Sequence, residues 1–505
     1  MSITLPGARS RNEDPDDSVL GALRSAARLR TETLAGLVVA LALIPEAIAF
    51  SVIAGVDPRV GLFSSVTMAI TIAVAGGRPA MISAATAAVA LVVAPVARQH
   101  GVDYLVATII LAGVFQLLLA SVGVAKLMRF IPRSVMIGFV NALAILVFVS
   151  QLRHLIDVPW LVYPLTALGI ALMVVLPKVT TAVPAPLVVV LVLTGLVVGF
   201  GCQIPDVGDQ GALPDSLPLP GLPHVPLTIQ TLQIIAPYAL GAALVGLLES
   251  LMTAKLVDDI TETPSNKTRE ASGQGLANIV TGFFGGMGGC AVVGQTMMNV
   301  KVAGARTRLS TFLTGAFVLL LVVSLGDLVG RIPMAALVAV MVMVSVATFD
   351  WHSVAPRTLK LLPRSETLVM AVTVIGTVST GNLAIGVSLG VLTAMVAFAR
   401  RVAHLTTVES GSDAGSLDSG TRVYRVRGEL FFASSNDLIH QFDYANDPDD
   451  VVIDLSHTDI WDASSVATLD AIRTKYESRG KTVRVTGLDG ESLVRLNRLS
   501  GRLGA

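Results

Sequence analysis

Two glutamates stand inside long apolar stretches, where charged residues are otherwise rare. Glu46 lies in the stretch 41–50, LALIPEAIAF, and Glu249 lies in the stretch 246–253, GLLESLMT. An ionised carboxylate at the centre of a bilayer costs roughly 3 kcal/mol even on the lenient insertion scale. Because desolvation favours the protonated form, such a group can take up and release a proton near neutral pH. We predict that Glu46 couples a proton, with Glu249 the next candidate; a neutral acid hydrogen-bonded to a neighbouring helix is the alternative.

Two other apolar segments are short and rich in small residues. One starts at Arg78-Pro79 and continues through SAATAA over 83–88, and the other starts within GGMGG over 285–289. In the bilayer interior an interrupted helix must line a cavity or be buried in protein, because its free backbone groups need partners. Two half-helices that meet at the midplane would direct their partially positive N-terminal ends into one cavity, which is typical of an anion site. Close packing of small residues is the alternative.

The elements that must position these residues are membrane-spanning helices. Of the 505 residues, 53% are hydrophobic and 14% are charged, whereas soluble domains carry about 25% charged residues. A spanning helix needs roughly 20 mainly apolar residues, and hydropathy predicts about fourteen spans in two sets of seven. The spans are expected near 34–55, 60–77, 80–95, 103–125, 134–150, 162–177 and 185–202, and then near 233–256, 270–287, 289–300, 309–329, 333–349, 366–380 and 382–399.

The segments outside the spans indicate orientation. Residues 1–33 mix acidic residues with five arginines before any long apolar run, so they are not a signal peptide and are expected to be cytoplasmic. Apolar residues at helical spacing over 19–27 predict a helix along the membrane surface or against a soluble domain. Residues 203–228 hold six prolines, three aspartates and no lysine or arginine, which predicts an extended loop outside the membrane.

Basic residues test this topology, because short cytoplasmic connections are enriched in lysine and arginine. With the N-terminus inside, every second connection should be basic. Those connections carry Arg78, Lys126, Arg129, Arg133, Lys178, Lys255, Lys267, Arg269, Lys301, Arg306, Arg308, Arg357, Lys360, Arg364, Arg400 and Arg401. The odd number of spans in each set inverts the second set relative to the first, which is typical of inverted-repeat transporters.

Several other classes of protein are disfavoured. Lysine plus arginine and aspartate plus glutamate each number 36, so the zero net charge gives no argument for a nucleic-acid partner. No GxxxxGK[ST] sequence is present, which disfavours an ATP-driven pump. Cys202 and Cys290 show no metal-ligand spacing and are interpreted as small buried hydrophobic residues. We expect no enzyme activity, no metal site and no cofactor.

Three stretches resemble the SulP sulfate-permease family, also called solute carrier family 26. They are PEAIAF with AGVDPRVGLF in residues 45–63, LESL with AK in 248–255, and GQGLANIVTGFFGG in 273–286. The resemblance implies a multi-span α-helical membrane protein with fourteen segments in two inverted repeats of seven. As in the uracil transporters, core and gate subdomains would move against each other. The transport domain is then expected over 34–402, with repeats at about 34–202 and 233–400.

The resemblance also implies an anion site between segments three and ten. Carried over by position, the binding residues are Glu46, Phe50, Thr86, Ala87, Gly294 and Gln295. Many members have glutamine where this chain has Glu46, and arginine where it has Gln295. The loss of a fixed cation and the gain of a titratable acid favour entry of the anion with a proton. A carboxylate or dicarboxylate is therefore at least as good a candidate substrate as sulfate or bicarbonate.

The C-terminal part differs in composition from the rest of the chain. A small polar linker is expected over 403–420, followed by a small α/β domain over 421–505. Residues 423–432 predict two short strands, 451–455 a buried strand, 464–479 a helix and 482–486 a strand. This pattern resembles the STAS domain of SulP members. In the related anti-sigma-factor antagonists a phosphorylated serine occupies the matching loop, so Ser464 is a candidate phosphosite; helix capping by Asp462 or Ser464 is the alternative.

The sequence thus predicts a secondary active anion transporter of the bacterial inner membrane that works by alternating access. The coupling ion is expected to be a proton, with sodium as the alternative. Expected partners are a small inorganic or organic anion, the lipid bilayer, a second copy in a homodimer and a cytoplasmic protein at the STAS domain. Rival interpretations are an uncoupled anion channel or exchanger, a purine or pyrimidine carrier of the same fold, and a membrane-embedded sensor that signals through the STAS domain.

Overall fold

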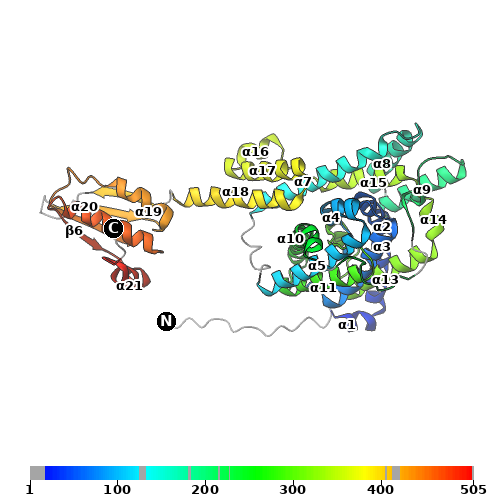
Figure 1. Cartoon of the computed structure of the whole chain (residues 1–505), viewed down its shortest axis with the longest axis horizontal. Coiled ribbons are helices and arrows are strands. Elements are labelled where there is room, and N and C mark those ends of the chain that lie inside the picture. Colours follow the sequence, from blue (N-terminus) through cyan, green and yellow to red (C-terminus); the bar gives the residue numbers. More distant parts are fainter. Residues whose placement is uncertain are drawn as a thin grey trace. The chain divides into compact units, whose positions relative to one another are not determined.

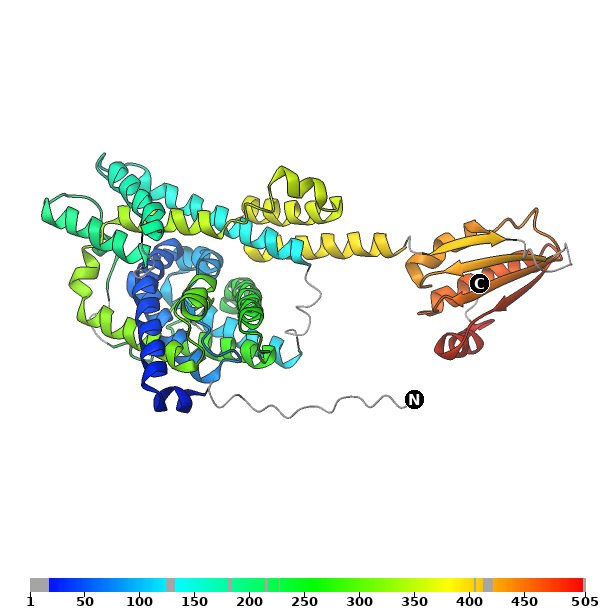
Figure 2. The ribbon, with the colours of Figure 1, turned by 180° about the vertical axis from the view of Figure 1, so that it is seen from behind.

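The chain forms two compact units. The computed structural model describes residues 18–123, 132–179, 184–213, 217–226, 228–403, 406–411 and 421–502. The first unit, Met1–Val391, is called here the membrane unit, and the second is Leu392–Ala505. Helix α18 (Leu383–Ala403) crosses the boundary between them. Figure 1 and Figure 2 show the elements of each unit from two opposite sides.

The first half of the membrane unit follows the predicted order of spans. The third predicted span, 80–95, is interrupted, because Ser83–Ala84 is an extended strand, β1, and helix α4 begins only at Ala87. Together, the elements of this half are α1 (Val19–Arg24), α2 (Ala26–Ala54), α3 (Pro58–Ala75), β1, α4 (Ala87–His100), α5 (Val102–Ser121), α7 (Arg133–Leu152), η3 (Arg153–Leu155), α8 (Val162–Val179) and α9 (Ala185–Gly199).

The second half repeats this pattern after the proline-rich connection, in which only the short η4 (Gly208–Gln210) is helical among the described residues. The tenth predicted span, 289–300, is again interrupted. Its strand β2 (Cys290–Ala291) precedes α12 (Val293–Met297), which continues into the π-helical turn η5 (Met298–Val302). The other elements are α10 (Ile229–Thr261), α11 (Lys267–Phe283), α13 (Arg308–Ser324), α14 (Gly326–Gly330), α15 (Met334–Thr348), α16 (Pro356–Leu361) and α17 (Arg364–Thr380).

The helices of the membrane unit pack as two groups. In the first group, α5 packs against α10 and α11, and α13 packs against α2 and α3. In the second group, α7 packs against α17, and α15 packs against α7 and α8. Helix α2 contacts α9 and α15 at the border between the groups. This division agrees with the predicted core and gate subdomains. In the described parts of the chain, seven helices are long and apolar enough to cross a bilayer.

The N-terminal segment contributes more to the membrane unit than its composition suggests. Residues 1–17 lie outside the described residues, and the helix predicted over 19–27 is divided at Ser25 between α1 and α2. Helix α2 starts eight residues before the predicted span. Its Glu32 is buried and accepts hydrogen bonds from the backbone N–H groups of Arg306, Thr307 and Ser310, at 2.9, 3.1 and 3.1 Å. Glu32 therefore caps the start of α13, although the sequence placed it in a segment outside the spans.

The second unit is a small α/β domain. Its sheet has the order β3 (Thr407–Gly411), β4 (Thr421–Arg427), β5 (Asp450–His457) and β6 (Thr482–Thr486). Strands β3 and β4 are antiparallel, whereas β4, β5 and β6 are parallel. Helices α19 (Phe432–Leu438), α20 (Ala463–Glu477) and α21 (Gly490–Leu499) complete the unit, with the short η6 (Ile439–Gln441) between α19 and β5.

Two local predictions for this unit were wrong. Residues 407–411, inside the predicted linker 403–420, form β3, because their backbone pairs along β4. The predicted second strand within 423–432 is only an isolated bridge from Leu430 to Ile460, and α19 then begins at Phe432. The capping interpretation is confirmed, because the Asp462 carboxylate accepts hydrogen bonds from the backbone N–H and the hydroxyl of Ser465, at 3.0 and 2.9 Å. Ser464 is exposed in the first turn of α20, and its phosphorylation stays a prediction.

Candidate functional site

The two interrupted segments meet as a pair of short strands. Strand β1 pairs with β2 in antiparallel register, with Ser83 opposite Ala291 and Ala84 opposite Cys290. Gly289 makes this approach possible, because an added Cβ there would lie 1.9 Å from the Ala84 carbonyl oxygen. The residues at the crossing are fully buried. The predicted juxtaposition of residues 80–95 and 289–300 is therefore present as a strand pair followed by helices.

The backbone of the crossing is satisfied by groups from several elements, as burial in a bilayer requires. The Val292 N–H donates to the Ile82 carbonyl at 2.9 Å, and the Ile82 N–H donates to the Thr296 hydroxyl at 3.0 Å. The Ala291 N–H donates to the Ser250 hydroxyl of α10 at 3.0 Å. These bonds fix the crossing against α10, the helix that carries Glu249.

Interhelical hydrogen bonds by amide side chains support the same region. Asn278 donates to the Gln116 side chain at 2.9 Å and to the Gly289 carbonyl at 3.1 Å, and accepts from the Gly289 N–H at 2.9 Å. Asn141 donates to the Ser353 hydroxyl at 2.9 Å. These amides therefore join elements of the protein to one another. Asn278 in addition holds the glycine on which the strand crossing depends.

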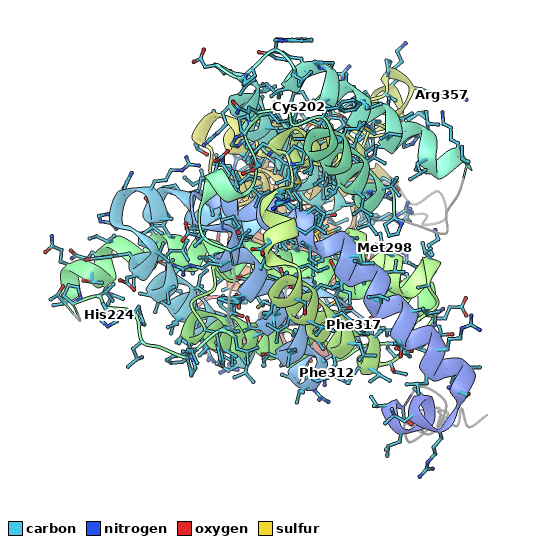
Figure 3. All side chains as sticks on the ribbon, turned by 90° about the vertical axis from the view of Figure 1, so that its right-hand side faces the viewer. Cys202, His224, Met298, Phe312, Phe317 and Arg357 are labelled. Carbon is cyan, nitrogen blue, oxygen red and sulfur yellow. The ribbon has the colours of Figure 1, made fainter. Side chains whose placement is uncertain are left out.

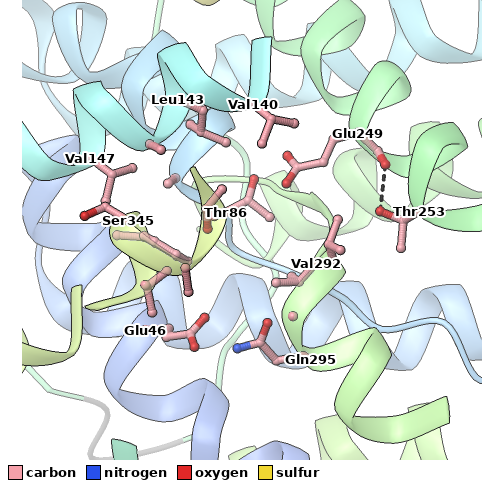
Figure 4. A pocket seen from close by; sticks show the side chains of 18 of the residues that line it. Glu46, Thr86, Val140, Leu143, Val147, Glu249, Thr253, Val292, Gln295 and Ser345 are labelled. Carbon is pink, nitrogen blue, oxygen red and sulfur yellow. Dashed lines mark hydrogen bonds between the residues drawn. The ribbon is translucent and has the colours of Figure 1, made fainter. Parts of the chain in front are cut away.

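A cavity of about 590 Å³ adjoins the crossing at the starts of α4 and α12. Figure 4 shows this cavity from close by. Glu46, Phe50, Thr86, Ala87, Gly294, Gln295 and Glu249 all line it. The structure therefore brings together all the residues that the sequence assigned to binding or coupling, from α2, α4, α10 and α12. Their roles in binding or coupling remain predictions.

The two carboxyl groups have different surroundings. Glu46 is buried, and Figure 4 shows its carboxylate and the Gln295 amide facing each other. Glu249 lies on another side of the cavity, where its Oε2 accepts a hydrogen bond from the Cys290 thiol at 2.9 Å. The Cys290 sulfur also lies 3.1 Å from the Thr86 hydroxyl. Glu249 is thereby connected through Cys290 to β2 and to the N-cap of α4, whereas Glu46 shares its side of the cavity with one amide.

Cys290 has a larger role than the sequence indicated. It is fully buried, as a small hydrophobic residue would be, but its thiol bridges Thr86 and Glu249. Sequence spacing could not predict this contact, because Cys290 and Glu249 are 41 positions apart. The described residues contain no group of three histidine, cysteine or acidic side chains that could hold a metal ion.

The sequence missed the apolar wall that faces the carboxyl groups. Helices α7 and α15, which belong to the second helix group, supply it. Apolar residues in apolar helices give no sign of which face lines a cavity, so sequence patterns could not identify them. The residues of this wall include Phe139, Val140, Leu143, Ala144, Val147, Met341, Val344, Ser345 and Thr348.

The charge balance of the cavity is unusual for a site that attracts anions. Among the described residues that line it, none is lysine, arginine or histidine, and the only ionisable carboxyl groups are those of Glu46 and Glu249. The polar side-chain donors are neutral: the hydroxyls of Thr86, Thr253, Ser345 and Thr348 and the amide of Gln295. Any favourable field for an anion must therefore come from these dipoles and from helix N-terminal N–H groups.

Helix α4 has its N-terminus, with the N–H groups of its first turn, at this cavity. It begins at Ala87, and the Thr86 hydroxyl caps it by accepting a hydrogen bond from the Val89 N–H at 3.4 Å. The helical stretch that starts at Val293 is only five residues of α-helix before it widens into η5. Gly294 in its first turn is exposed to open space, because an added Cβ there would meet no atom within 4 Å. Both helix starts thus border the cavity.

Each of the two units of the chain matches the model of a known protein family or domain. The model of the sulfate permease family matches residues 29–162 and 158–373, and the model of the STAS domain matches residues 417–500. A Bacillus subtilis (strain 168) protein named "Putative sulfate transporter YbaR" is 50% identical over 464 residues, which cover 92% of this chain and 95% of that protein. The bicarbonate transporter BicA of Picosynechococcus is 27% identical over 524 residues, covering 93% of this chain and 91% of that protein.

Solved structures show the same fold. The overall structure of SLC26A9 superposes with a TM-score of 0.79 at 15% sequence identity, covering 95% of this chain and 88% of that one. The transmembrane domain of a cyanobacterial bicarbonate transporter, BicA, superposes with a TM-score of 0.61 at 21% identity, covering 73% of this chain and 98% of that one.

Proposed function

The chain belongs to the sulfate permease family, and we propose that its membrane unit carries a small anion by alternating access, together with protons. The observation that carries this proposal is the composition of one cavity. Two helix starts and two buried carboxyl groups border it, and none of its described lining residues carries a fixed positive charge. A cavity with two helix starts, two carboxyl groups and no fixed positive charge in its described lining favours an anion only when proton uptake matches the negative charge of the anion.

The anion would bind where the starts of α4 and α12 face the cavity. Backbone N–H groups in the first turn of a helix have no partner within the helix and favour negative charge. The Thr86 hydroxyl and the Gln295 amide supply further donors without adding charge. Gly294 leaves open space beside the second helix start. An anion in this position would lie next to Glu46 and would be repelled whenever that carboxylate is ionised.

Proton coupling follows from this repulsion. In the proposed cycle Glu46 takes up a proton when the anion enters and releases it when the anion leaves. Binding of the anion and binding of the proton then favour each other reciprocally. Glu249 is the second candidate for the coupling group, with sodium as the alternative coupling ion. The Cys290 thiol, which donates to Glu249, compensates part of any charge on that carboxylate.

The apolar wall favours an organic anion. Phe50, Phe139, Leu143 and Met341 present hydrocarbon to the cavity, and hydrocarbon cannot replace the water shell of a compact, highly charged ion. The carbon chain of a carboxylate or dicarboxylate would pack on this wall while its carboxylate faces the helix starts. We therefore place carboxylates first among the candidate substrates, ahead of bicarbonate and sulfate.

Alternating access would use the two helix groups. The ionisable side of the cavity comes from α2, α4, α10 and α12, and the apolar side comes from α7 and α15. Movement of one group past the other would change which side of the membrane the cavity faces. We further propose a homodimer in the inner membrane, with the N-terminus and the STAS domain in the cytoplasm and the STAS domain available to a protein partner.

An uptake screen in proteoliposomes tests the proposal. Purified full-length protein is reconstituted, and uptake of labelled sulfate, bicarbonate, nitrate and C4-dicarboxylates is measured with and without an inward pH gradient. We expect accumulation of a carboxylate that depends on the gradient. Flux that ignores the gradient would remove proton coupling and favour an uncoupled channel or exchanger. Absence of flux for every anion would favour the sensor interpretation.

A further inference from the structure

A second cavity, separate from the one around Glu46, lies along α9. It has a volume of about 440 Å³, and α2, α9, α13 and α14 line it. It borders α2 at Ile44 and Pro45, the residues directly before Glu46. Figure 3 views this side of the membrane unit, with Cys202 just beyond α9 and with Phe312 and Phe317 on α13. Its walls are almost entirely aliphatic, from residues such as Leu187, Leu191, Val198 and Leu325.

The cavity has the length of one lipid leaflet. Its lining on α9 runs from Leu187 to Gly199, and a helix rises about 1.5 Å per residue, so this stretch measures about 18 Å. Half of the hydrocarbon core of a bilayer is about 15 Å thick. Leu191 and Leu328, which line the cavity, are also about half exposed at 55% and 49%, so the cavity is open to the surroundings of the helices, which in a bilayer are acyl chains.

Two glycines keep the α9 wall open. An added Cβ at Gly195 or at Gly199 would meet no atom within 4 Å. Glycine inside a helix lowers its stability by roughly 1 kcal/mol relative to alanine, and neither residue adopts a left-handed backbone or makes a close helix contact that would require glycine. Their effect is to leave room along the cavity for a guest molecule.

The polar groups of this cavity suit a phospholipid. Of the described residues that line it, Arg331 alone carries a charge, and its guanidinium has no hydrogen-bond or ion-pair partner within the described part of the chain. The Thr194 side chain is 6% exposed, and its buried hydroxyl likewise makes no hydrogen bond in the described structure. An exposed cation and a buried unpaired donor in the lining of one apolar cavity match a phosphate followed by an ester carbonyl and an acyl chain.

We propose that the cavity between α2, α9, α13 and α14 is a binding site for one glycerophospholipid. Its acyl chain fills the cavity beside Gly195 and Gly199, its phosphate pairs with Arg331, and an ester carbonyl accepts from the Thr194 hydroxyl. The lipid would contact α2 of the first helix group and α9 of the second. This site is independent of the anion cavity, since the two share no lining residue.

Photo-crosslinking in vesicles tests the site. Full-length protein is reconstituted in phosphatidylethanolamine and phosphatidylglycerol with a trace of phosphatidylglycerol that carries a diazirine on its acyl chain, and the labelled peptides are identified by mass spectrometry. Labelling of α9, α13 and α14 is divided by labelling at Val174 and Val175 of α8, which are exposed apolar positions outside the cavity. We expect this ratio to be well above one in the wild-type chain. A ratio near one would mean ordinary lipid contact and would overturn the proposal.

Variants whose side chains fill the cavity are compared with the wild type in the same crosslinking experiment. Gly195→Leu and, independently, Gly199→Leu place a side chain in the open space, so each should lower the ratio at least about fivefold. Arg331→Gln should lower it as well, whereas Arg59→Gln should not, because Arg59 pairs with Asp57 outside the cavity at 3.4 Å. Gly221→Leu, at an open position in the proline-rich connection, is the folding control. An unchanged ratio in both glycine variants of α9, with both proteins monodisperse, would contradict the site whether or not the chain transports anions.

Discussion

At the scale of single residues, the proposed site depends on which groups are able to change charge. Glu46 and Glu249 border the same cavity, but only Glu249 has a thiol donor, from Cys290. The amide of Gln295 faces Glu46 from the position where, by the family resemblance, many members carry arginine. A cavity with acids and neutral donors can admit an anion without net charge only if a proton or a cation enters as well.

Gly294 offers a direct test of where the anion binds. Gly294→Cys in a Cys202→Ala background should react with a small membrane-impermeant thiol reagent, because the space around Gly294 is open. Cys290 should stay unmodified, because it is fully buried. A transported anion should slow the reaction several-fold by occupying the same space. Gly221→Cys in the same background is the control and should react at one rate with or without the anion. If the reagent modifies the Gly294→Cys variant at the same rate with and without the anion, the anion binds elsewhere.

The polar residues of the site could be predicted from sequence, whereas the apolar ones could not. Glu46 and Glu249 are conspicuous because a carboxyl group in an apolar stretch is costly. Phe139 and Met341 have no such signal, since they resemble every other residue of their helices. Glu32 was missed for another reason: it precedes the long apolar run, and its partners at 306–310 are more than 270 positions away.

At the scale of elements, the crossing of β1 and β2 positions everything else in the site. Sequence patterns predicted that residues 80–95 and 289–300 are interrupted, because small residues and glycines cluster there. The patterns could not predict that the interruptions pair as strands, since that pairing joins residues about 200 positions apart. Strand β3 was missed for a different reason: its residues are polar or small and have the composition of a linker, although their partners in β4 are close in sequence.

Gly289→Ala should disrupt the crossing. The new Cβ would lie 1.9 Å from the Ala84 carbonyl oxygen, which is backbone and cannot turn aside. We expect a loss of about 3 kcal/mol or more in stability, seen as a lower midpoint of thermal unfolding in detergent and a poor yield of monodisperse protein. Gly221→Ala, at an open position, should match the wild type. A Gly289→Ala protein of normal thermal stability would show that the strands do not approach as closely as described.

The STAS domain contains a buried acid shared by two tyrosines. The Tyr476 hydroxyl donates to Asp447 at 2.5 Å, and the Tyr424 hydroxyl donates to the same carboxylate at 2.8 Å. Burial, together with the neighbouring Asp447 carboxylate, raises the pKa of both phenols above the usual value. The folded domain therefore keeps these protons at a pH where the unfolded chain loses them.

The stability of the STAS domain should consequently depend on alkaline pH. The contribution of these two tyrosines to its free energy of unfolding should be constant below about pH 10, the ordinary pKa of tyrosine, and should fall as the pH rises above that value. Pulse proteolysis of the full chain in urea, at pH 8 and at higher pH, measures this. Tyr476→Phe should be less stable at pH 8 by roughly 2 kcal/mol, since it loses a hydrogen bond to a charged group. Its free energy of unfolding should also fall less than that of the wild type when the pH is raised into the alkaline range. If the stability of wild-type and Tyr476→Phe protein depends on pH in the same way, Tyr476 does not retain its proton in the folded domain as described.

At the scale of the whole molecule, two packed helix groups enclose the cavity around Glu46 and Glu249, and each group supplies one chemical side of that cavity. The order of spans, the interruption of the third and tenth, and the C-terminal α/β domain could be predicted from hydropathy, glycine clusters and family resemblance. The division into two packed helix groups rested on the resemblance alone, because hydropathy does not determine which helices pack together.

In the proposed cycle, Glu46 exchanges a proton each time the anion passes. The most direct measurement compares wild-type and Glu46→Gln proteoliposomes in two assays of the same labelled anion: accumulation driven by a pH gradient, and exchange against unlabelled anion without a gradient. Glutamine keeps the size and hydrogen bonding of the protonated acid but cannot release a proton. We predict that Glu46→Gln retains exchange and loses gradient-driven accumulation, whereas the wild type shows both. Normal uphill accumulation by Glu46→Gln would contradict the account and assign the proton to another group, with Glu249 the next to test.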